Sequence, residues 1–305
     1  MALFGSTMKP TGFTMADRRV QRWGKILRKL LENKSATFGL IMVLGVIVSA
    51  IFAPLLSPHD PLLSDVDRRL LPPIGQEGAN PSYLLGTDYL GRDIVSRLIY
   101  GARISLVVSI SAVAFSAIFG TIIGLISGFY GGMIDSIFMR LADVQLAFPF
   151  ILLAIAIVAV LGPSLQNIII VMAITGWVIY ARVVRAEILS LREKEFVIAA
   201  RALGGSNGRI IFQHLLPNVI PQCIVIITLE MARMIIMEAA LSFLGLGIQP
   251  PTPTWGGMLA DGRVYLATSW WLATFPGLVI MLVVLGINLL GNWLRDMLDP
   301  RLTQL

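Results

Sequence analysis

Residues 195–218 have the sequence EFVIAARALGGSNGRIIFQHLLPN and interrupt a chain that otherwise consists mainly of apolar runs. The runs on both sides are long enough to cross a membrane, so this segment must emerge into water as an ordered loop. Its alternation of apolar and basic positions suits a short helix that docks onto another protein. The alternative is a solvated basic loop that only enforces topology, but topology requires charge and not the Ala-Ala pair, the Gly pair and the closing Leu-Pro.

The composition places this loop in an integral membrane protein. Hydrophobic residues make up 56% of the 305 residues, charged residues make up 14%, and the mean hydropathy is +0.80. A net charge of +6 is compatible with nucleic-acid binding, but basic residues in a membrane chain more often mark cytoplasmic loops. We therefore expect a lipid membrane and no nucleic acid. The single cysteine, Cys223, lies in an apolar run and provides no disulfide framework.

Six runs are long enough to span the hydrocarbon core, which takes about 20 residues in a helix. The third run contains Pro149, a residue that membrane helices tolerate, and the fifth begins at Val219 and contains three charged residues. The sequence therefore predicts an all-α membrane protein with six transmembrane helices. The runs are 36–56, 104–126, 144–162, 163–181, the run from Val219 onward, and 272–293.

The distribution of basic residues predicts the topology. The N-terminal tail, 1–34, carries eight Lys or Arg and two acidic residues, and the apolar run after it lacks a cleavage site, so we expect an uncleaved anchor. With this tail in the cytoplasm, the inner segments hold 17 Lys or Arg and the outer segments hold six. Both termini are then cytoplasmic. Residues 35–305 form one transmembrane domain, with an extracytoplasmic loop at 57–103 and a cytoplasmic loop at 195–217.

Small residues recur every four positions in the second run, which places them on one stripe of the helix. Such a stripe lets another helix approach closely, and that neighbour lies either within the chain or in a partner subunit. The stripe comprises Ala112, Ser116, Gly120, Gly124 and Gly128.

Three charged residues lie in the fifth run, where each costs roughly 2.5 to 3.5 kcal/mol at a helix centre on insertion scales. Glu230 and Arg233 share a helix face, and Glu238 is close enough around the helix for all three to face a common polar surface. Two interpretations stay open. The charges lie beside a hydrated translocation path, or they form a mutually neutralising pair at a subunit interface.

Two outer segments carry patterns of their own. Residues 86–103 mix charged and apolar positions as a helix lying flat on the membrane would, which would support docking of a binding protein. A structural elbow leading into the second run is the alternative. Residues 248–257 are rich in proline and predict a rigid outer loop, with Trp270 and Trp271 as residues of the membrane interface.

The sequence offers little for catalysis. It has no HExxH motif, no Cys or His cluster with metal-ligand spacing and no GxxxxGK[ST] phosphate loop, so we expect no catalytic site and no metal site. If ATP drives this protein, another chain binds it. An ion-coupled secondary transporter that uses the three intramembrane charges is the alternative class. Such transporters usually have paired repeats, and no repeat of about 20 to 50 residues is visible.

The 195–218 segment resembles the cytoplasmic loop of ATP-binding-cassette importer permeases. The pattern of that loop is Glu-Ala-Ala, three residues, Gly, nine residues, Ile, one residue, Leu-Pro. Two positions depart from it, because Ile198 replaces the glutamate and His214 replaces the isoleucine. The lost carboxylate puts in doubt any salt bridge from that position, and Glu195 does not necessarily restore it. The matching residues are Ala199, Ala200, Gly204, Leu216 and Pro217.

The resemblance covers nearly the whole chain. Residues 85–103, 241–257 and 289–302 are similar to the C-type permease subunit of dipeptide, oligopeptide and nickel importers, with Asn292 where aspartate is expected. It implies the type I importer permease fold with a cytoplasmic coupling helix, in the cytoplasmic membrane of a bacterium or archaeon. The implied substrates are di- or oligopeptides, with nickel complexes, glycosides or opines as alternatives.

The resemblance also implies partners. They are a second, B-type permease that completes a heterodimer, two ATP-binding subunits that hold ATP and Mg, and an extracytoplasmic substrate-binding protein. This chain would bind no cofactor. Its small residues would let the coupling helix sit in a cleft of the ATPase, its arginines would meet acidic groups at the rim, and Pro217 would lead into the fifth span. The implied coupling residues are Glu195, Ala199, Ala200, Arg201, Gly204, Arg209 and Pro217.

Overall fold

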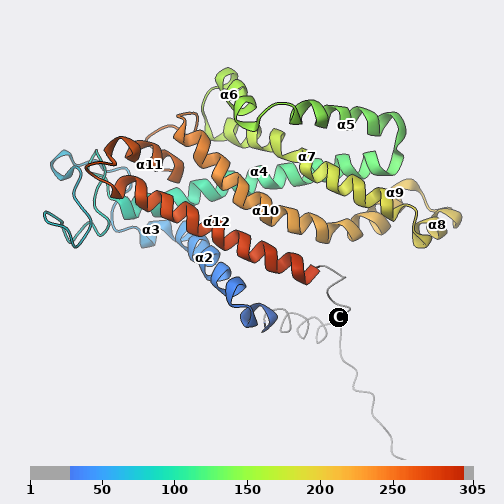
Figure 1. Ribbon diagram of the computed structural model, residues 1–305, viewed down its shortest axis with the longest axis horizontal. Helices are drawn as coiled ribbons and strands as arrows, with labels where there is room; N and C mark the ends of the chain where they lie inside the picture. Colours follow the sequence, from blue (N-terminus) through green and yellow to red (C-terminus); the bar gives the residue numbers. More distant parts are fainter. Residues whose placement is uncertain (1–27, 299–305) are drawn as a thin grey trace, which may run out of the picture.

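The computed structural model describes residues 28–298, and in this range the chain is helical apart from loops and one isolated antiparallel bridge (Figure 1). Most of the N-terminal tail and the last seven residues lie outside it. Five helices are long and apolar enough to cross a membrane, and a bent helix pair raises the number to six. The predicted fold class is confirmed. The five helices are α2 (Lys34–Ile51), α4 (Ile94–Tyr130), α7 (Leu165–Leu191), α10 (Leu216–Phe243) and α12 (Trp271–Leu298).

The third predicted span is not a continuous helix. It is divided between α5 (Gly132–Leu146) and α6 (Phe150–Leu161), which are bent by 92° relative to each other. The break falls at Pro149, which lacks an amide hydrogen and disfavours helical backbone at Phe148. The prediction of one helix that tolerates Pro149 is therefore wrong.

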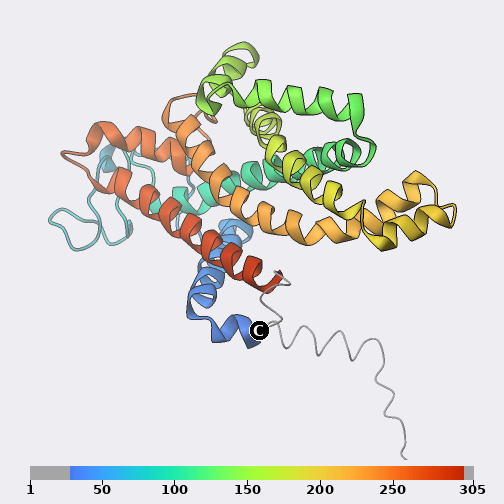
Figure 2. The same cartoon turned by 45° about the vertical axis from the view of Figure 1, so that its right-hand side comes forward.

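The glycine stripe of α4 lies against α7, and both views show these helices next to each other (Figures 1 and 2). Helix backbones approach so closely here that any side chain in place of these glycines would clash. The neighbour of the stripe therefore lies within this chain. A Cβ would lie 2.3 Å from the Trp177 carbonyl oxygen at Gly120, 2.7 Å from the Ala181 carbonyl oxygen at Gly124 and 2.8 Å from Ile188 Cβ at Gly128.

Two tryptophans, Trp255 and Trp271, pack in the core at the end of the helix bundle where α4 begins. Trp255 begins α11 (Trp255–Gly262) and is buried in a core shared with α4, α10 and α12. Trp271 is also buried, and its Nε1 donates a hydrogen bond to the Thr87 carbonyl oxygen at 3.3 Å. The prediction that Trp271 belongs to the membrane interface is therefore wrong, whereas Trp270 beside it is exposed. The predicted outer loop at 248–257 ends at residue 254, where α11 begins.

The two polar parts of the chain lie at opposite ends of the molecule. Figures 1 and 2 show α8 (Glu195–Ala202) and α9 (Asn207–Arg209) at one end, and α11 with the 57–93 segment at the other. The long helices run between these ends. The short elements are α3 (Ala53–Leu56), η1 (Val66–Arg68), η2 (Ile210–Leu215) and η3 (Arg263–Tyr265).

Candidate functional site

Residues 195–217, which we call the coupling segment after the prediction for them, form two short helices joined by a turn. Glu195 lies in the first turn of α8, where a carboxylate interacts favourably with the helix dipole. Gly204 follows the end of α8 with a φ of +77°, a conformation that favours glycine. Ser206 caps α9, because its Oγ accepts a hydrogen bond from the Arg209 amide at 3.4 Å. The glycine and the cap together fix the direction in which the chain returns to the membrane.

The inner side of the segment is anchored to α4 and α7. Val197 and Ile210 are fully buried in one apolar cluster with Phe129 of α4 and Ile188 of α7. The Arg201 guanidinium lies over the Phe129 ring, with 5.9 Å between Cζ and the ring centroid. The segment is therefore fixed to the helix ends and does not hang from them as a free loop.

The rest of the segment exposes apolar side chains, which we call the coupling surface: Ile198, Leu203 and Phe212. Their exposed fractions are 54%, 88% and 66%. Exposed apolar side chains gathered at a polar end are typical of an interaction site. The sequence reasoning concentrated on small and basic residues and missed Leu203 and Phe212, although an apolar residue directly before a glycine turn was a usable signal. Of the predicted coupling residues, Ala200 is half-buried and the others, Glu195, Ala199, Arg201, Gly204, Arg209 and Pro217, are exposed.

The segment continues directly into a membrane helix. The π-helical turn η2 joins α9 to α10, so that one helix of 37 residues runs over Asn207–Phe243. Pro217 lies at the start of α10, and the Asn218 side-chain amide donates to the His214 carbonyl oxygen at 2.6 Å. Turns of π-helix are frequent at functional sites. The segment and the membrane helix therefore form one continuous helix.

The three intramembrane charges form two separate groups. Arg233 Nη1 lies 3.2 Å from Glu230 Oε2, and the Glu230 side chain is 5% exposed while that of Arg233 is 45% exposed. Glu238 is buried and accepts hydrogen bonds from Ser105 Oγ at 3.1 Å and Ser242 Oγ at 2.8 Å. The prediction of a common polar surface is wrong for Glu238, which lies about 140° around the helix from Arg233. Glu238 instead links α10 to α4.

The variant Glu238→Leu is expected to lower the melting temperature of the purified protein more than Glu238→Gln does. Leucine leaves two buried hydroxyls without their acceptor, at about 1–3 kcal/mol for each unsatisfied group. Glutamine keeps a carbonyl oxygen as acceptor. Thermal unfolding in detergent measures the difference, and equal melting temperatures for the two variants would contradict this role.

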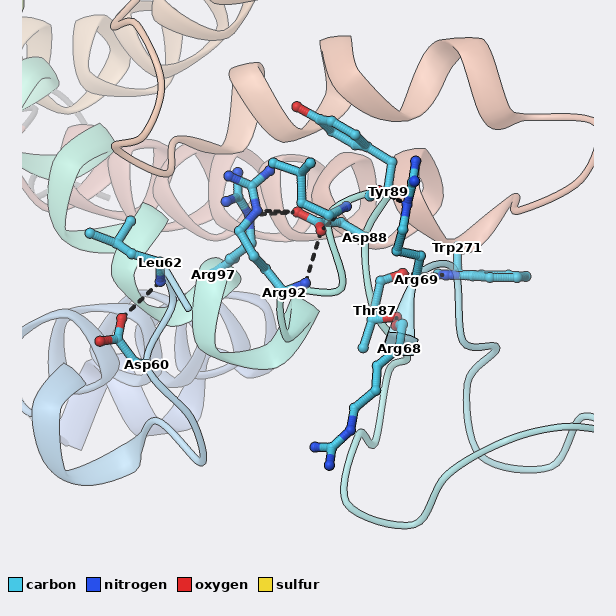
Figure 3. A network of polar contacts seen from close by, with 11 residues as sticks. Asp60, Leu62, Arg68, Arg69, Thr87, Asp88, Tyr89, Arg92, Arg97 and Trp271 are labelled. Atoms are coloured by element: carbon cyan, nitrogen blue, oxygen red, sulfur yellow. Dashed lines mark hydrogen bonds and ion pairs between the residues drawn. The ribbon is translucent and has the colours of Figure 1, made fainter. Parts of the chain in front are cut away.

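A buried ion network precedes α4 at the opposite end (Figure 3). Arg92 Nε donates to Asp88 Oδ2 at 2.7 Å, and Arg97 Nε lies 3.5 Å from the same oxygen. All three side chains are buried. The prediction of a flat surface helix over 86–103 is therefore wrong, because its charges turn inward and α4 begins only at Ile94. The elbow alternative describes this segment correctly.

Two glycines let residues 65–73 pack closely over the turn before α4. A Cβ at Gly91 would lie 1.8 Å from the Asp65 carbonyl oxygen, and one at Gly86 would lie 2.3 Å from the Leu71 carbonyl oxygen. Arg69 of the same stretch contacts the turn through its side chain, because its Nε donates to the Tyr89 carbonyl oxygen at 2.6 Å (Figure 3). Residues 65–73 thus pack against the 86–91 turn, beside which the ion network is buried.

Two cavities lie at this end of the molecule. The larger, of about 710 Å³, is open and is lined by residues that include His59, Asp60 and Arg103. The smaller, of about 210 Å³, is lined by residues that include Arg97 and Asp261. Burial raises the pKa of Asp261 above its ordinary value, against the opposing effect of the nearby arginines.

The bundle of apolar helices, with two short helices at one end, is that of a multi-span membrane protein. The chain belongs to the family of binding-protein-dependent transport system inner membrane components, whose model matches residues 120–304. The model of the N-terminal transmembrane domain of oligopeptide transport permease C matches residues 21–73. The family resemblance seen in the sequence is confirmed, and it favours a transport subunit of an importer over an ion-coupled secondary transporter.

Curated relatives match over most of the chain. It is 49% identical over 283 residues to the dipeptide transport system permease protein DppC of Alkalihalophilus pseudofirmus, covering 93% of this chain and 91% of that protein. It is 47% identical over 271 residues to the di/tripeptide transport system permease protein DppC of Pseudomonas aeruginosa, covering 89% of each. The glutathione transport system permease protein GsiD of Pectobacterium atrosepticum is 41% identical over 281 residues, covering 92% and 91%. All three are named as transport permeases and not as enzymes.

Proposed function

We propose that this chain is a pore-forming subunit of an ATP-driven importer that moves di- or oligopeptides across the cytoplasmic membrane. The names of the relatives support peptides over nickel complexes, glycosides or opines. The observation that carries the proposal is the continuous helix Asn207–Phe243, which joins an exposed apolar surface to the membrane core.

The importer consists of this chain, a second B-type permease, two ATP-binding subunits and an extracytoplasmic substrate-binding protein. The ATP-binding subunits hold ATP and Mg. The coupling surface fits a cleft in one of them, because its apolar side chains need a partner to leave water. Arg209 beside it is exposed and suited to an acidic group at the rim of such a cleft.

Closure of the ATP-binding subunits pushes on α8 and α9. Since Val197 and Ile210 are packed against α4 and α7, the segment moves together with these helices as a rigid body. The helix through α10 carries the same displacement to the Glu230–Arg233 pair. There the half-exposed Arg233 faces the translocation path or the second permease.

Uptake into proteoliposomes tests this function. The complete complex, supplied with its binding protein and ATP, is expected to accumulate a labelled di- or tripeptide, and vesicles that contain this chain alone are expected to accumulate none. Nickel complexes, glycosides and opines serve as competitors. ATP-independent uptake by the single chain, or selective uptake of one of the competitors, would contradict the proposal.

Cysteine labelling tests the proposed topology. In a Cys223→Ser background, Lys194→Cys is expected to react with a membrane-impermeant maleimide only in inverted vesicles, and Glu77→Cys only in intact cells. Both positions are exposed, and Cys223 is the only cysteine of the chain, so the background is silent. Labelling of both positions from the same side would contradict the topology.

A further inference from the structure

The smaller cavity, of about 210 Å³, lies at the end of the molecule opposite to the coupling segment. It is bounded by the first turn of α4, the end of α10, the loop that follows α10, and α11. At about 30 Å³ for each water in the liquid, the space corresponds to roughly seven water molecules. This is smaller than the ~300–1,000 Å³ typical of drug-sized ligands, so the cavity suits the polar ends of a small molecule.

Arg97 brings an incompletely paired cation to this cavity. Its side chain is 5% exposed, and its contact with the ion network is the 3.5 Å approach of Nε to Asp88 Oδ2 (Figure 3). Asp88 is already engaged by Arg92 at the shorter distance of 2.7 Å. Among the described residues, Arg97 Nη1 is buried without a hydrogen-bond partner. A buried guanidinium strongly favours an anionic acceptor, because unsatisfied charged donors are costly.

Asp261 of α11 brings a carboxylate to the same cavity. It is half-buried, and it forms no ion pair within 4.0 Å with any residue of the described range 28–298. Three other polar side chains at the cavity have partners: Thr254 caps α11, Ser242 donates to Glu238, and the Gln249 amide donates to carbonyl oxygens of its own loop. The cavity therefore offers a guanidinium whose buried Nη1 has no hydrogen-bond partner among the described residues, and a carboxylate that forms no ion pair there.

We propose that this cavity is a subsite for small zwitterionic peptides, in which Arg97 binds the terminal carboxylate and Asp261 binds the terminal ammonium group. The assignment rests on the proposed function, because it identifies the zwitterion as a transported peptide. A charged hydrogen bond at each terminus gives recognition that ignores the side chains of the peptide. Such a subsite would accept dipeptides of many sequences and reject molecules that lack either charge.

Direct binding to the assembled complex tests the subsite without the binding protein. Saturation-transfer NMR measures the affinity of the complex for three ligands. Ala-Ala carries both terminal charges, Ala-Ala-amide lacks the carboxylate, and N-acetyl-Ala-Ala lacks the ammonium group. We expect removal of either charge to weaken binding about tenfold in the wild-type complex. Asp261→Asn is expected to weaken Ala-Ala about tenfold and to leave N-acetyl-Ala-Ala unchanged. Arg97→Met is expected to weaken Ala-Ala similarly and to leave Ala-Ala-amide unchanged.

Arg103→Met is the matched control, because Arg103 is exposed and lines the larger cavity. It is expected to change none of the three affinities. Arg97→Met leaves Asp88 paired with Arg92, so the complex is expected to assemble. If the Arg97→Met complex does not assemble, the binding data for Asp261→Asn alone test the subsite. Ala-Ala affinity that Asp261→Asn leaves unaltered, or equal binding of all three ligands to the wild-type complex, would overturn the subsite.

A second readout separates this inference from the proposed function. ATP-dependent uptake of Ala-Ala is measured with the same wild-type preparation and its binding protein. Uptake together with unaltered binding in the Asp261→Asn variant would overturn the subsite and leave the peptide importer standing. No uptake of any di- or tripeptide would overturn the proposed function, on which the subsite depends.

Discussion

Replacement of Leu203 by aspartate is expected to uncouple ATP hydrolysis from peptide uptake. Leu203 is 88% exposed, so the change removes little packing within the chain and should leave folding intact. In the proposed complex this side chain is buried against an ATP-binding subunit, and burial of a leucine contributes about 1.5–3 kcal/mol. Burying an unpaired carboxylate in its place adds to the loss. A total of about 3 kcal/mol corresponds to a roughly 100-fold weaker contact.

Two comparisons sharpen this test. Leu203→Met keeps an apolar side chain of similar size and is expected to retain uptake. A charge at the neighbouring Gly204 is less decisive, because its φ of +77° strains most side chains whatever their charge. Uptake and ATP hydrolysis by proteoliposomes measure the outcome. Wild-type uptake by Leu203→Asp, at wild-type amounts of protein, would contradict the docking role of the coupling surface.

The parts of this structure that local sequence signals determine could be predicted. A long uncharged run is sufficient to predict a span, as for α2 and α12, because the bilayer requires continuous apolar helix whatever surrounds it. The glycine turn and the return of the chain into the fifth span follow from the Gly pair and Leu-Pro in the same way. The glycine stripe of α4 predicted a close helix neighbour, although the identity of α7 as that neighbour required the structure.

The parts that depend on distant segments could not be predicted. The 86–103 pattern of charged and apolar residues suits a helix on a membrane surface and equally an elbow whose polar side is covered. Only the packing of residues 65–73 over Gly86 and Gly91 decides between them. Trp271 and Glu238 were misplaced for the same reason, since their partners Thr87 and Ser105 are far away in sequence. At Pro149 a single span was predicted, and a bent helix pair occurs instead.

Removal of the Asp88 carboxylate is expected to prevent accumulation of folded protein. In Asp88→Ala, the guanidinium groups of Arg92 and Arg97 stay buried without their shared partner. Removal of one member of a buried ion pair costs about 3–5 kcal/mol, which is a large part of the 5–15 kcal/mol that typically separates folded from unfolded proteins. Asp88 Oδ1 also accepts backbone hydrogen bonds from residues 90 and 92, so the turn before α4 loses its support as well.

Matched variants show whether the loss of folded protein in Asp88→Ala is caused by the unpaired charges that stay buried. Asp65→Ala removes a half-buried carboxylate that pairs with Arg68 and caps η1, and it is expected to cost about 1 kcal/mol. Asp88→Ala combined with Arg97→Met buries one unpaired cation instead of two, and it should therefore recover part of the lost protein. Expression in membranes and melting temperature in detergent measure both effects. If Asp88→Ala accumulates and melts like Asp65→Ala, the network does not hold the elbow, and the start of α4 must be fixed by the Asp93 cap and by apolar packing around Trp255 and Trp271.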